Sequence, residues 1–230
     1  MSRLFDGVDD VITIAQNQIL GNAALVLSFK LDSLPAAGST MVLYDHRGTN
    51  GRGNAVFVNS SLTVRFGYSS ATQRNEDFVY NAVSAGIWYT VAATFSPVDA
   101  DGIGSLYVNG KLADNTTSRN IPGGTNGQGT IRIGTDISGA SAMSGQIAHI
   151  IWYKRFLGVG ELIQSTYYPG SIGNDFSMVM NFPLRGTASP EPGYSKSSLL
   201  GTVSGPLNGT TEPPINGMFT IPRPELMRSF

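Results

Sequence analysis

The sequence has no cysteine, few charged residues and no long apolar run. Without cysteine, neither a disulfide framework nor a thiolate metal site or nucleophile can form. Charged residues make up 13% of the chain and the formal net charge is -1, so no strong field draws it to nucleic acid or to an anionic membrane surface. No apolar stretch approaches the roughly 18 residues needed to cross a bilayer. We therefore expect recognition of partners by shape and polar contacts.

The N-terminus also lacks the apolar core of a secretory signal. Residues 1–7 read Met-Ser-Arg-Leu-Phe-Asp-Gly and enter folded-looking sequence at once. This start predicts synthesis and assembly in a cytoplasm.

The residues needed for catalysis are missing from the expected positions. A glycoside hydrolase needs two carboxyl groups roughly 5 to 9 Å apart, and on one strand these would occupy alternate positions. The adjacent acidic pairs at 9–10 and 76–77 would point to opposite faces of a strand. His46 and His149 fall in different strands, and no Gly-x-Ser-x-Gly elbow occurs. We therefore predict a protein that is not an enzyme, with glycoside hydrolysis as the least favoured alternative.

Short runs rich in Val, Ile, Thr and aromatic residues alternate with clusters of Gly, Asn, Asp and Ser from Phe5 to Phe182. This pattern is typical of many antiparallel strands. Asn109-Gly110 is the strongest turn signal, because both residues accept the positive φ angles of a tight type I′ hairpin. The predicted strands are 11–15, 23–30, 40–45, 55–58, 62–67, 76–80, 88–95, 104–108, 130–134, 148–156 and 177–182.

Residues 158–167 are the one stretch with helical character. Val159, Leu162, Ile163 and Thr166 would fall on one face of a helix. We therefore predict one short helix in an otherwise all-β chain.

The composition changes after Arg185, since seven of the chain's 12 prolines lie beyond it. Proline cannot donate to a β-ladder, so an irregular arm is predicted over residues 186–230, following a sandwich domain at 1–185. The arm is nevertheless too apolar for a solvated segment and should pack on its own domain or on a neighbouring subunit. The residues predicted to make this contact are Leu199, Leu200, Met218, Phe219, Ile221, Leu226, Met227 and Phe230.

Four ordered segments resemble the laminin-G-like branch of the concanavalin A-like lectin/glucanase superfamily. They are residues 4–14, 86–95 with 104–112, 131–136, and 144–157 with 161–163. The resemblance covers about residues 4–185 and implies a jelly-roll sandwich of two antiparallel sheets, one of them concave. It also implies buried positions for Trp88 and Trp152. Members of the superfamily bind glycans, calcium or proteins, and a few hydrolyse glycans.

The resemblance also implies a structural calcium ion as an option, although the predicted function requires no cofactor. Asp45, Asp77 and Asp136 lie at strand ends or in loops, where hard oxygen ligands would come from. Asp99 and Asp101 are placed in the same way, and every one of these residues also suits an ordinary turn. The segment Asp6–Asp10 could be read as a metal loop, but we favour a turn in which Gly7 has a positive φ angle.

Three functions remain open at this point. The apolar arm and the resemblance to jelly-roll domains of phage particles favour a virion structural protein, most simply a capsid decoration or cement protein. Such a protein would bind a capsid or other virion partner and form a homo-oligomer, without nucleic acid or membrane. The alternative is a glycan-binding, lectin-like adhesion module of a phage tail or fibre, whose ligand would meet the polar loops at 47–54, 68–75 and 115–129. A glycoside hydrolase is the third.

Overall fold

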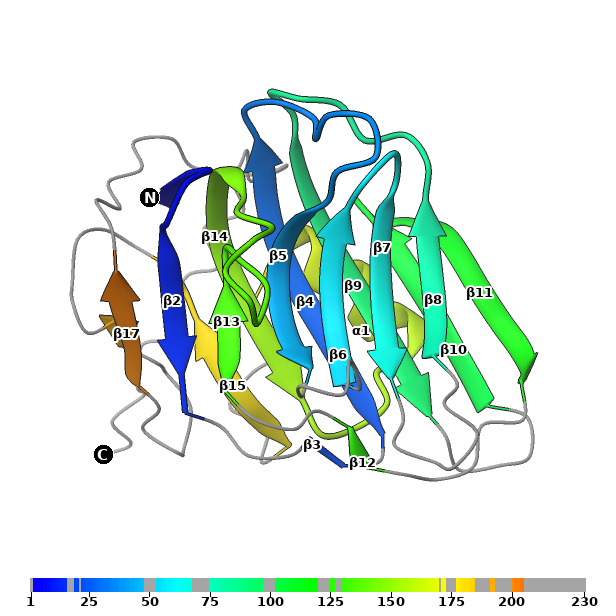
Figure 1. Cartoon of the computed structure of the whole chain (residues 1–230). Coiled ribbons are helices and arrows are strands. Elements are labelled where there is room, and N and C mark those ends of the chain that lie inside the picture. Colours follow the sequence, from blue (N-terminus) through cyan, green and yellow to red (C-terminus); the bar gives the residue numbers. More distant parts are fainter. Residues whose placement is uncertain are drawn as a thin grey trace, which may run out of the picture.

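The chain folds into a sandwich of two antiparallel sheets that face each other, with one helix on the outer side of one sheet (Figure 1). This computed structural model describes residues 2–15, 19–20, 22–47, 53–67, 75–96, 102–119, 125–126, 130–169, 171–172, 177–184, 191–192 and 200–204. The arrangement confirms the predicted all-β sandwich with one short helix.

The seven-stranded sheet, called sheet A, has the strand order β1-β14-β4-β9-β10-β11. β1 and β15 pair with the same edge of β14. β1 lies along its first half and β15 along its second half. The strands are β1 (Arg3–Asp6), β4 (Ala23–Leu31), β9 (Trp88–Ser96), β10 (Gly102–Val108), β11 (Lys111–Arg119), β14 (Ser144–Tyr153) and β15 (Met178–Phe182).

The eight-stranded sheet, called sheet B, has the order β16-β17-β2-β13-β5-β6-β7-β8 and lies in front in Figure 1. Its strands are β2 (Val11–Ile14), β5 (Met41–Arg47), β6 (Gly53–Val58), β7 (Leu62–Gly67), β8 (Asn75–Tyr80), β13 (Ile131–Ile133), β16 (Glu191–Pro192) and β17 (Leu200–Ser204). A separate short pair joins β3 (Ile19–Leu20) to β12 (Thr125–Asn126).

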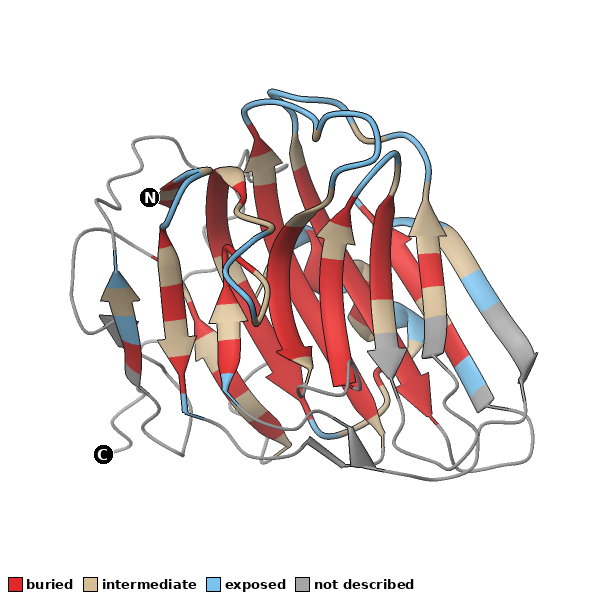
Figure 2. Ribbon diagram, in the orientation of Figure 1, coloured by how far each residue is buried: buried red, intermediate tan, exposed pale blue. Residues whose placement is uncertain are grey.

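The two faces of sheet A are both covered, and the sequence of β4 reflects this. Leu25 and Leu27 face sheet B within the main core, whereas Ala24 and Val26 share a second cluster with Leu162 of helix α1 (Val159–Tyr167). A strand buried on both faces needs apolar residues at every position. Figure 2 accordingly shows β4 and its neighbours buried along most of their length.

Sheet B differs, because the described part of the chain places no helix on its outer side. In β2 and β13 buried and partly exposed residues alternate, as expected when one face meets the core and the other does not. The inward residues Ile12, Ile14, Ile131 and Ile133 are fully buried.

Helix α1 starts one residue later than the predicted segment and ends where predicted. Glu161 accepts a hydrogen bond from the amide of Gly158 (2.9 Å) and pairs with Arg155, which fixes the first turn. Of the residues predicted to share one face, Leu162 and Thr166 are buried, whereas Val159 is 57% exposed. Among the described residues, no helix has the length and apolar character that crossing a bilayer requires.

The Asn109-Gly110 hairpin is confirmed, with φ angles of 48° and 80° at the two positions. It joins β10 to β11, the outermost strand of sheet A. At this side of the sandwich, Asp114 of β11 accepts a hydrogen bond from the amide of Val79 in β8 (2.9 Å). The two sheets are therefore linked through their edge strands.

The structure places two strands beyond residue 185, where the sequence predicted an irregular arm. β17 pairs with β2, and β16 pairs with β17. Val203 packs against the main core. The expectation of little regular structure is therefore wrong for residues 200–204, because their backbone extends sheet B of the same domain. The domain boundary at 185 itself stays a prediction.

Candidate functional site on the outer face of sheet B

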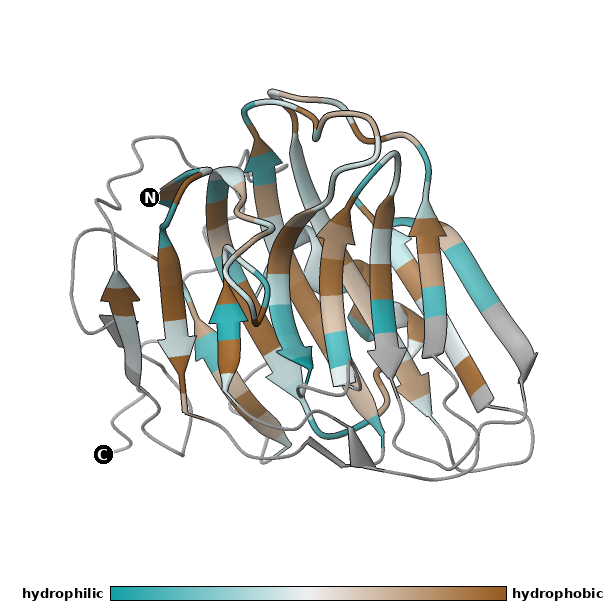
Figure 3. Cartoon of the chain, in the orientation of Figure 1, coloured by the Kyte–Doolittle hydropathy of each residue, from teal (hydrophilic) through white to brown (hydrophobic). Residues whose placement is uncertain are grey.

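A row of side chains crosses the outer face of sheet B from one strand to the next. The residues are cross-strand partners in the sheet register, and they alternate along each strand with residues of the main core, so their side chains point away from it. Figure 3 shows hydrophilic segments in β13, β5, β7 and β8 that belong to this row. The members of this polar row are Thr202, Thr13, Arg132, Asp45, Ala55, Arg65 and Asp77.

Two bidentate ion pairs fix the charges of the row. Arg47, two residues after Asp45 on β5, donates to both oxygens of that carboxylate, at 2.8 and 2.6 Å. Arg65 donates in the same way to Asp77 on the neighbouring strand, with both distances 2.7 Å. Hydrogen bonds to these aspartates raise the pKa of both arginines above the ordinary value. The paired geometry holds the guanidinium groups in fixed orientations.

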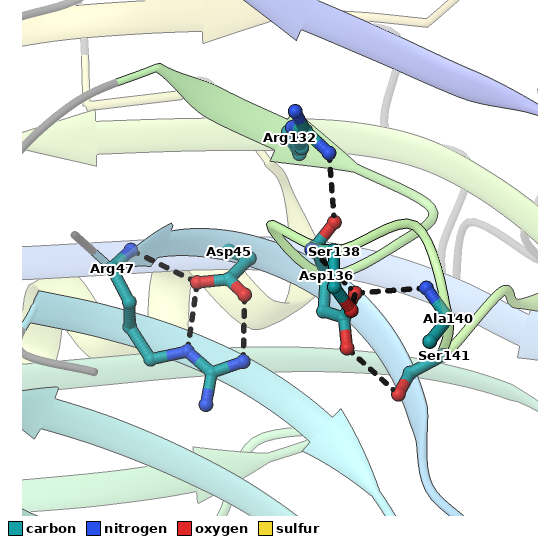
Figure 4. A network of polar contacts seen from close by, with 7 residues as sticks. All are labelled: Asp45, Arg47, Arg132, Asp136, Ser138, Ala140 and Ser141. Atoms are coloured by element: carbon teal, nitrogen blue, oxygen red, sulfur yellow. Dashed lines mark hydrogen bonds and ion pairs between the residues drawn. The ribbon is translucent and has the colours of Figure 1, made fainter. Parts of the chain in front are cut away.

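The loop after β13 is organised around Asp136 and lies beside the Asp45–Arg47 pair (Figure 4). Its carboxylate accepts hydrogen bonds from the amide and hydroxyl of Ser138, the amide of Ala140 and the hydroxyl of Ser141, at 2.7 to 3.0 Å. Burial disfavours the charged form of Asp136, but these hydrogen bonds together outweigh burial and lower the pKa of this carboxyl. Asp136 therefore stays ionised, and its carboxylate holds its own loop in place through these hydrogen bonds.

Arg132 on β13 is next to both groups, as the cross-strand partner of Asp45 and a hydrogen-bond donor to the Asp136 loop. In the part of the chain that the structure describes, its one hydrogen bond runs from Nη1 to the main-chain oxygen of Asp136, at 3.2 Å. Its cross-strand neighbours are Thr13 and Asp45. Thr13 is partly exposed, and Thr202 beyond it is exposed. This end of the row thus offers two hydroxyl groups and an arginine to a ligand.

The three predicted calcium ligands are not brought together among the described residues. Asp45 and Asp77 belong to different ion pairs, and Asp136 is bound by its loop. These carboxylates therefore do not fit a calcium shell, which needs several free oxygens around one point. Asp99 and Asp101 lie outside the described residues, and calcium binding by the protein stays a prediction.

The carboxylates that do gather are those of Asp6, Asp9 and Asp10, in the turn where the chain passes from β1 in sheet A to β2 in sheet B. One oxygen of each lies within 4.8 Å of the others. Gly7 has a φ angle of 83°, Asp6 accepts from the amide of Val8, and Asp10 accepts from the amide of Asp6. These contacts confirm the turn that the sequence analysis favoured.

Asp10 is only 1% exposed, and burial raises its pKa. The negative charges of Asp6 and Asp9 add to this effect, while the hydrogen bond from the Asp6 amide opposes it. As pH rises above the unfolded-state pKa near 3.8, the unfolded chain releases this proton before the folded chain does. The free energy of unfolding therefore falls with rising pH through this group.

Replacing Asp10 with asparagine is expected to raise the free energy of unfolding at pH 7. The amide oxygen can still accept from the Asp6 amide, and the neutral side chain removes the repulsion. The gain should shrink as pH falls below about 4, where the wild-type carboxyl becomes protonated in both states. Urea unfolding at several pH values measures it, with the exposed Asp32→Asn as a control of equal charge change. A destabilised Asp10→Asn protein at pH 7 would contradict the expectation.

The two aspartates of the polar row do not suit glycoside hydrolysis. Asp45 and Asp77 lie on β5 and β8, three strand spacings apart, which is about 14 Å at the usual spacing. Hydrolases hold their carboxyl groups roughly 5 to 9 Å apart. That the protein is not an enzyme stays a prediction.

The structure describes only some of the other residues that the sequence analysis singled out. Trp152 is fully buried, as predicted, whereas Trp88 is partly exposed beneath the ammonium group of Lys30, 5.8 Å away. Much of the three polar loops lies outside the described residues. So do the predicted partner-binding residues, apart from the backbone of Leu200 in β17: Leu199, Met218, Phe219, Ile221, Leu226, Met227 and Phe230.

Known structures share this architecture at low sequence identity. A proposed carbohydrate-binding protein from Bacteroides ovatus superposes with a TM-score of 0.68 at 13% identity, over 94% of this chain and 61% of that one. The present chain thus spans about three fifths of that protein. A heptameric SAP-like pentraxin from Limulus polyphemus gives 0.60 at 13% identity, over 88% and 94% of the two chains. The binding domain of botulinum neurotoxin DC, in complex with SialylT, gives 0.53 at 17% identity, over 72% and 42%.

A search of curated proteins finds no match. The sequence profile of the laminin-G-like family described as the concanavalin A-like lectin/glucanases superfamily matches residues 6–162. This is more than half of the chain, and it overlaps each of the four segments from which the resemblance was drawn. The chain therefore belongs to the concanavalin A-like lectin/glucanases superfamily.

Proposed function

We propose that the protein is a glycan-binding module and that the ligand lies on the outer face of sheet B. The observation that carries this proposal is the polar row, which crosses the sheet on the face that points away from the core and that carries no helix within the described ranges. The outer face of sheet A is covered in part by α1, whereas Thr13, Thr202 and Arg132 remain accessible on sheet B.

The chemistry of the row suits a sugar. Sugar hydroxyl groups donate and accept hydrogen bonds, and the row supplies threonine hydroxyls together with guanidinium donors. Cross-strand neighbours lie about 5 Å apart, so neighbouring groups of one sugar can reach two adjacent members. The ion pairs of Arg47 and Arg65 orient these side chains before a ligand arrives, which lowers the entropy lost on binding.

The structural relatives support the same class of function. One is a proposed carbohydrate-binding protein, and the toxin domain was determined in complex with SialylT. The capsid-decoration role stays a prediction without such support. It rests on the arm, whose described strand β17 pairs within its own domain.

A glycan array with a blocking variant tests the proposal. Thr202→Trp places a large ring at the exposed end of the polar row and is expected to weaken binding of the array hits at least tenfold. Gln164→Trp makes the same addition on helix α1, which lies beyond sheet A, and should leave binding unchanged. Binding by the wild type and by both variants is measured with calcium and with a chelator, to determine whether it depends on metal. Absence of any saturable binding, or equal loss in both variants, would overturn the assignment of this face.

A further inference from the structure

Arg132 is the one arginine of the outer-face network without a carboxylate partner among the described residues. Arg47 and Arg65 each hold a carboxylate with two hydrogen bonds. Arg132 instead donates to a main-chain oxygen, that of Asp136. A guanidinium group has five N–H donors in a planar fork, so most of its capacity is not used by the described part of the chain.

The two nearest carboxylates cannot supply the missing partner, because they are already engaged. Asp45 is the cross-strand neighbour of Arg132, but both of its oxygens accept hydrogen bonds from Arg47. Asp136 has one oxygen bound by Ser138 and Ala140 and the other by Ser141. Figure 4 shows Arg132 above these two groups, on the same side of the sheet.

We propose that Arg132 binds the carboxylate of an acidic sugar, so that the ligands of this face are glycans carrying uronic or sialic acid residues. This inference rests on the proposed glycan-binding function and names its ligand class. A planar carboxylate matches the guanidinium fork with two parallel hydrogen bonds. The hydroxyls of Thr13 and Thr202 follow at about 5 and 10 Å along the row, where they meet the hydroxyl groups of the same or the next sugar.

The charge balance of the face favours a carboxylate over a densely sulfated chain. Its three arginines, Arg47, Arg65 and Arg132, are matched by the three aspartates Asp45, Asp77 and Asp136. Among the described residues of the row and its adjoining loop, no excess of positive charge is therefore available to attract a polyanion. Arg132, with N–H donors that the described residues do not use, can pair with one singly charged group such as a carboxylate.

The test compares an acidic oligosaccharide with the same oligosaccharide after reduction of its carboxyl groups to alcohols. Calorimetric titration of the full chain is expected to show at least tenfold tighter binding of the acidic form, the size of effect that a charge-assisted bidentate contact gives. Arg132→Gln should abolish this preference, so that the acidic and the reduced form bind with equal affinity. Arg132→Lys should keep only part of it, because an ammonium group cannot form the fork.

Lys111→Gln is the matched control, since it removes one positive charge from an exposed position on β11 in sheet A. It should leave both affinities unchanged. Thermal unfolding of every variant checks the fold, and the wild-type comparison of acidic and reduced sugar remains decisive if Arg132→Gln does not fold. Equal binding of the two forms by wild type would refute the inference and leave the proposed function standing. Tighter binding of a sulfated polymer than of the uronate or sialylated ligand would also refute it, whereas no binding of any sugar would remove the proposed function as well.

Discussion

Replacing Trp152 with alanine is expected to lower the free energy of unfolding by about 3 to 5 kcal/mol, the usual loss when a large buried aromatic residue is truncated. Trp152 is fully buried on β14 of sheet A. Its ring stacks on Tyr44 of β5 in sheet B, with ring centres 5.7 Å apart and an angle of 14° between the planes. Its removal would leave a cavity between the two sheets.

Urea unfolding followed by circular dichroism measures this loss without depending on tryptophan fluorescence. Trp152→Phe should lose less, because it keeps a ring against Tyr44. Trp88→Ala is the second control, since Trp88 is only partly buried at the start of β9. An effect of Trp152→Ala no larger than that of Trp88→Ala would show that this stacking is not central to the sandwich.

Replacing Gly145 with alanine is expected to cost about 3 kcal/mol or more, combining backbone strain with overpacking. Gly145 has a φ angle of 148° at the point where β14 pairs with β1 on one side and β4 on the other. A β-carbon there would lie 2.8 Å from the Cα atom of Leu31 and would also collide with the carbonyl group of Lys30. These are backbone atoms, so no side-chain rotation can relieve the contact.

Two other glycines separate the causes of this effect. Gly38 also has a positive φ angle, 81°, but a β-carbon there would meet nothing within 4 Å. Gly38→Ala should therefore report the backbone strain alone, about 1 kcal/mol. Gly160→Ala, in helix α1 with equally open surroundings, should be neutral or stabilising by up to about 1 kcal/mol. A Gly145→Ala protein no less stable than Gly38→Ala would refute the steric explanation.

The sequence predicted the strands that contain a strong apolar pattern and missed those without one. The tight hairpin was clear because Asn109 and Gly110 accept an unusual backbone geometry. β11 was missed beyond its first residues, since Lys-Leu-Ala-Asp-Asn-Thr-Thr-Ser-Arg lacks the apolar alternation of a half-buried strand. β17 was not predicted, because the prolines on either side of it indicated irregular structure throughout this part of the chain.

The candidate site could be predicted only in fragments. Ile-Arg-Ile in β13 and Val-Ile-Thr-Ile in β2 show that Arg132 and Thr13 point away from the core. They do not show that these strands are neighbours, because strand order results from long-range pairing. The calcium ligands were chosen by position at strand ends, and the arginines that neutralise two of them lie two residues and twelve residues away. Only the assembled sheet places these charges together.

The contact between Asp114 and Val79 also bears on self-association. Edge strands with unpaired amides invite strands from other molecules, and proteins avoid such aggregation by blocking or charging those edges. β8 and β11 are both edge strands, and a carboxylate from one occupies a backbone donor of the other. A second copy adding a strand to β8 would first have to displace a charged group from that amide. This contact therefore opposes edge-to-edge pairing of β8 with a strand from another molecule.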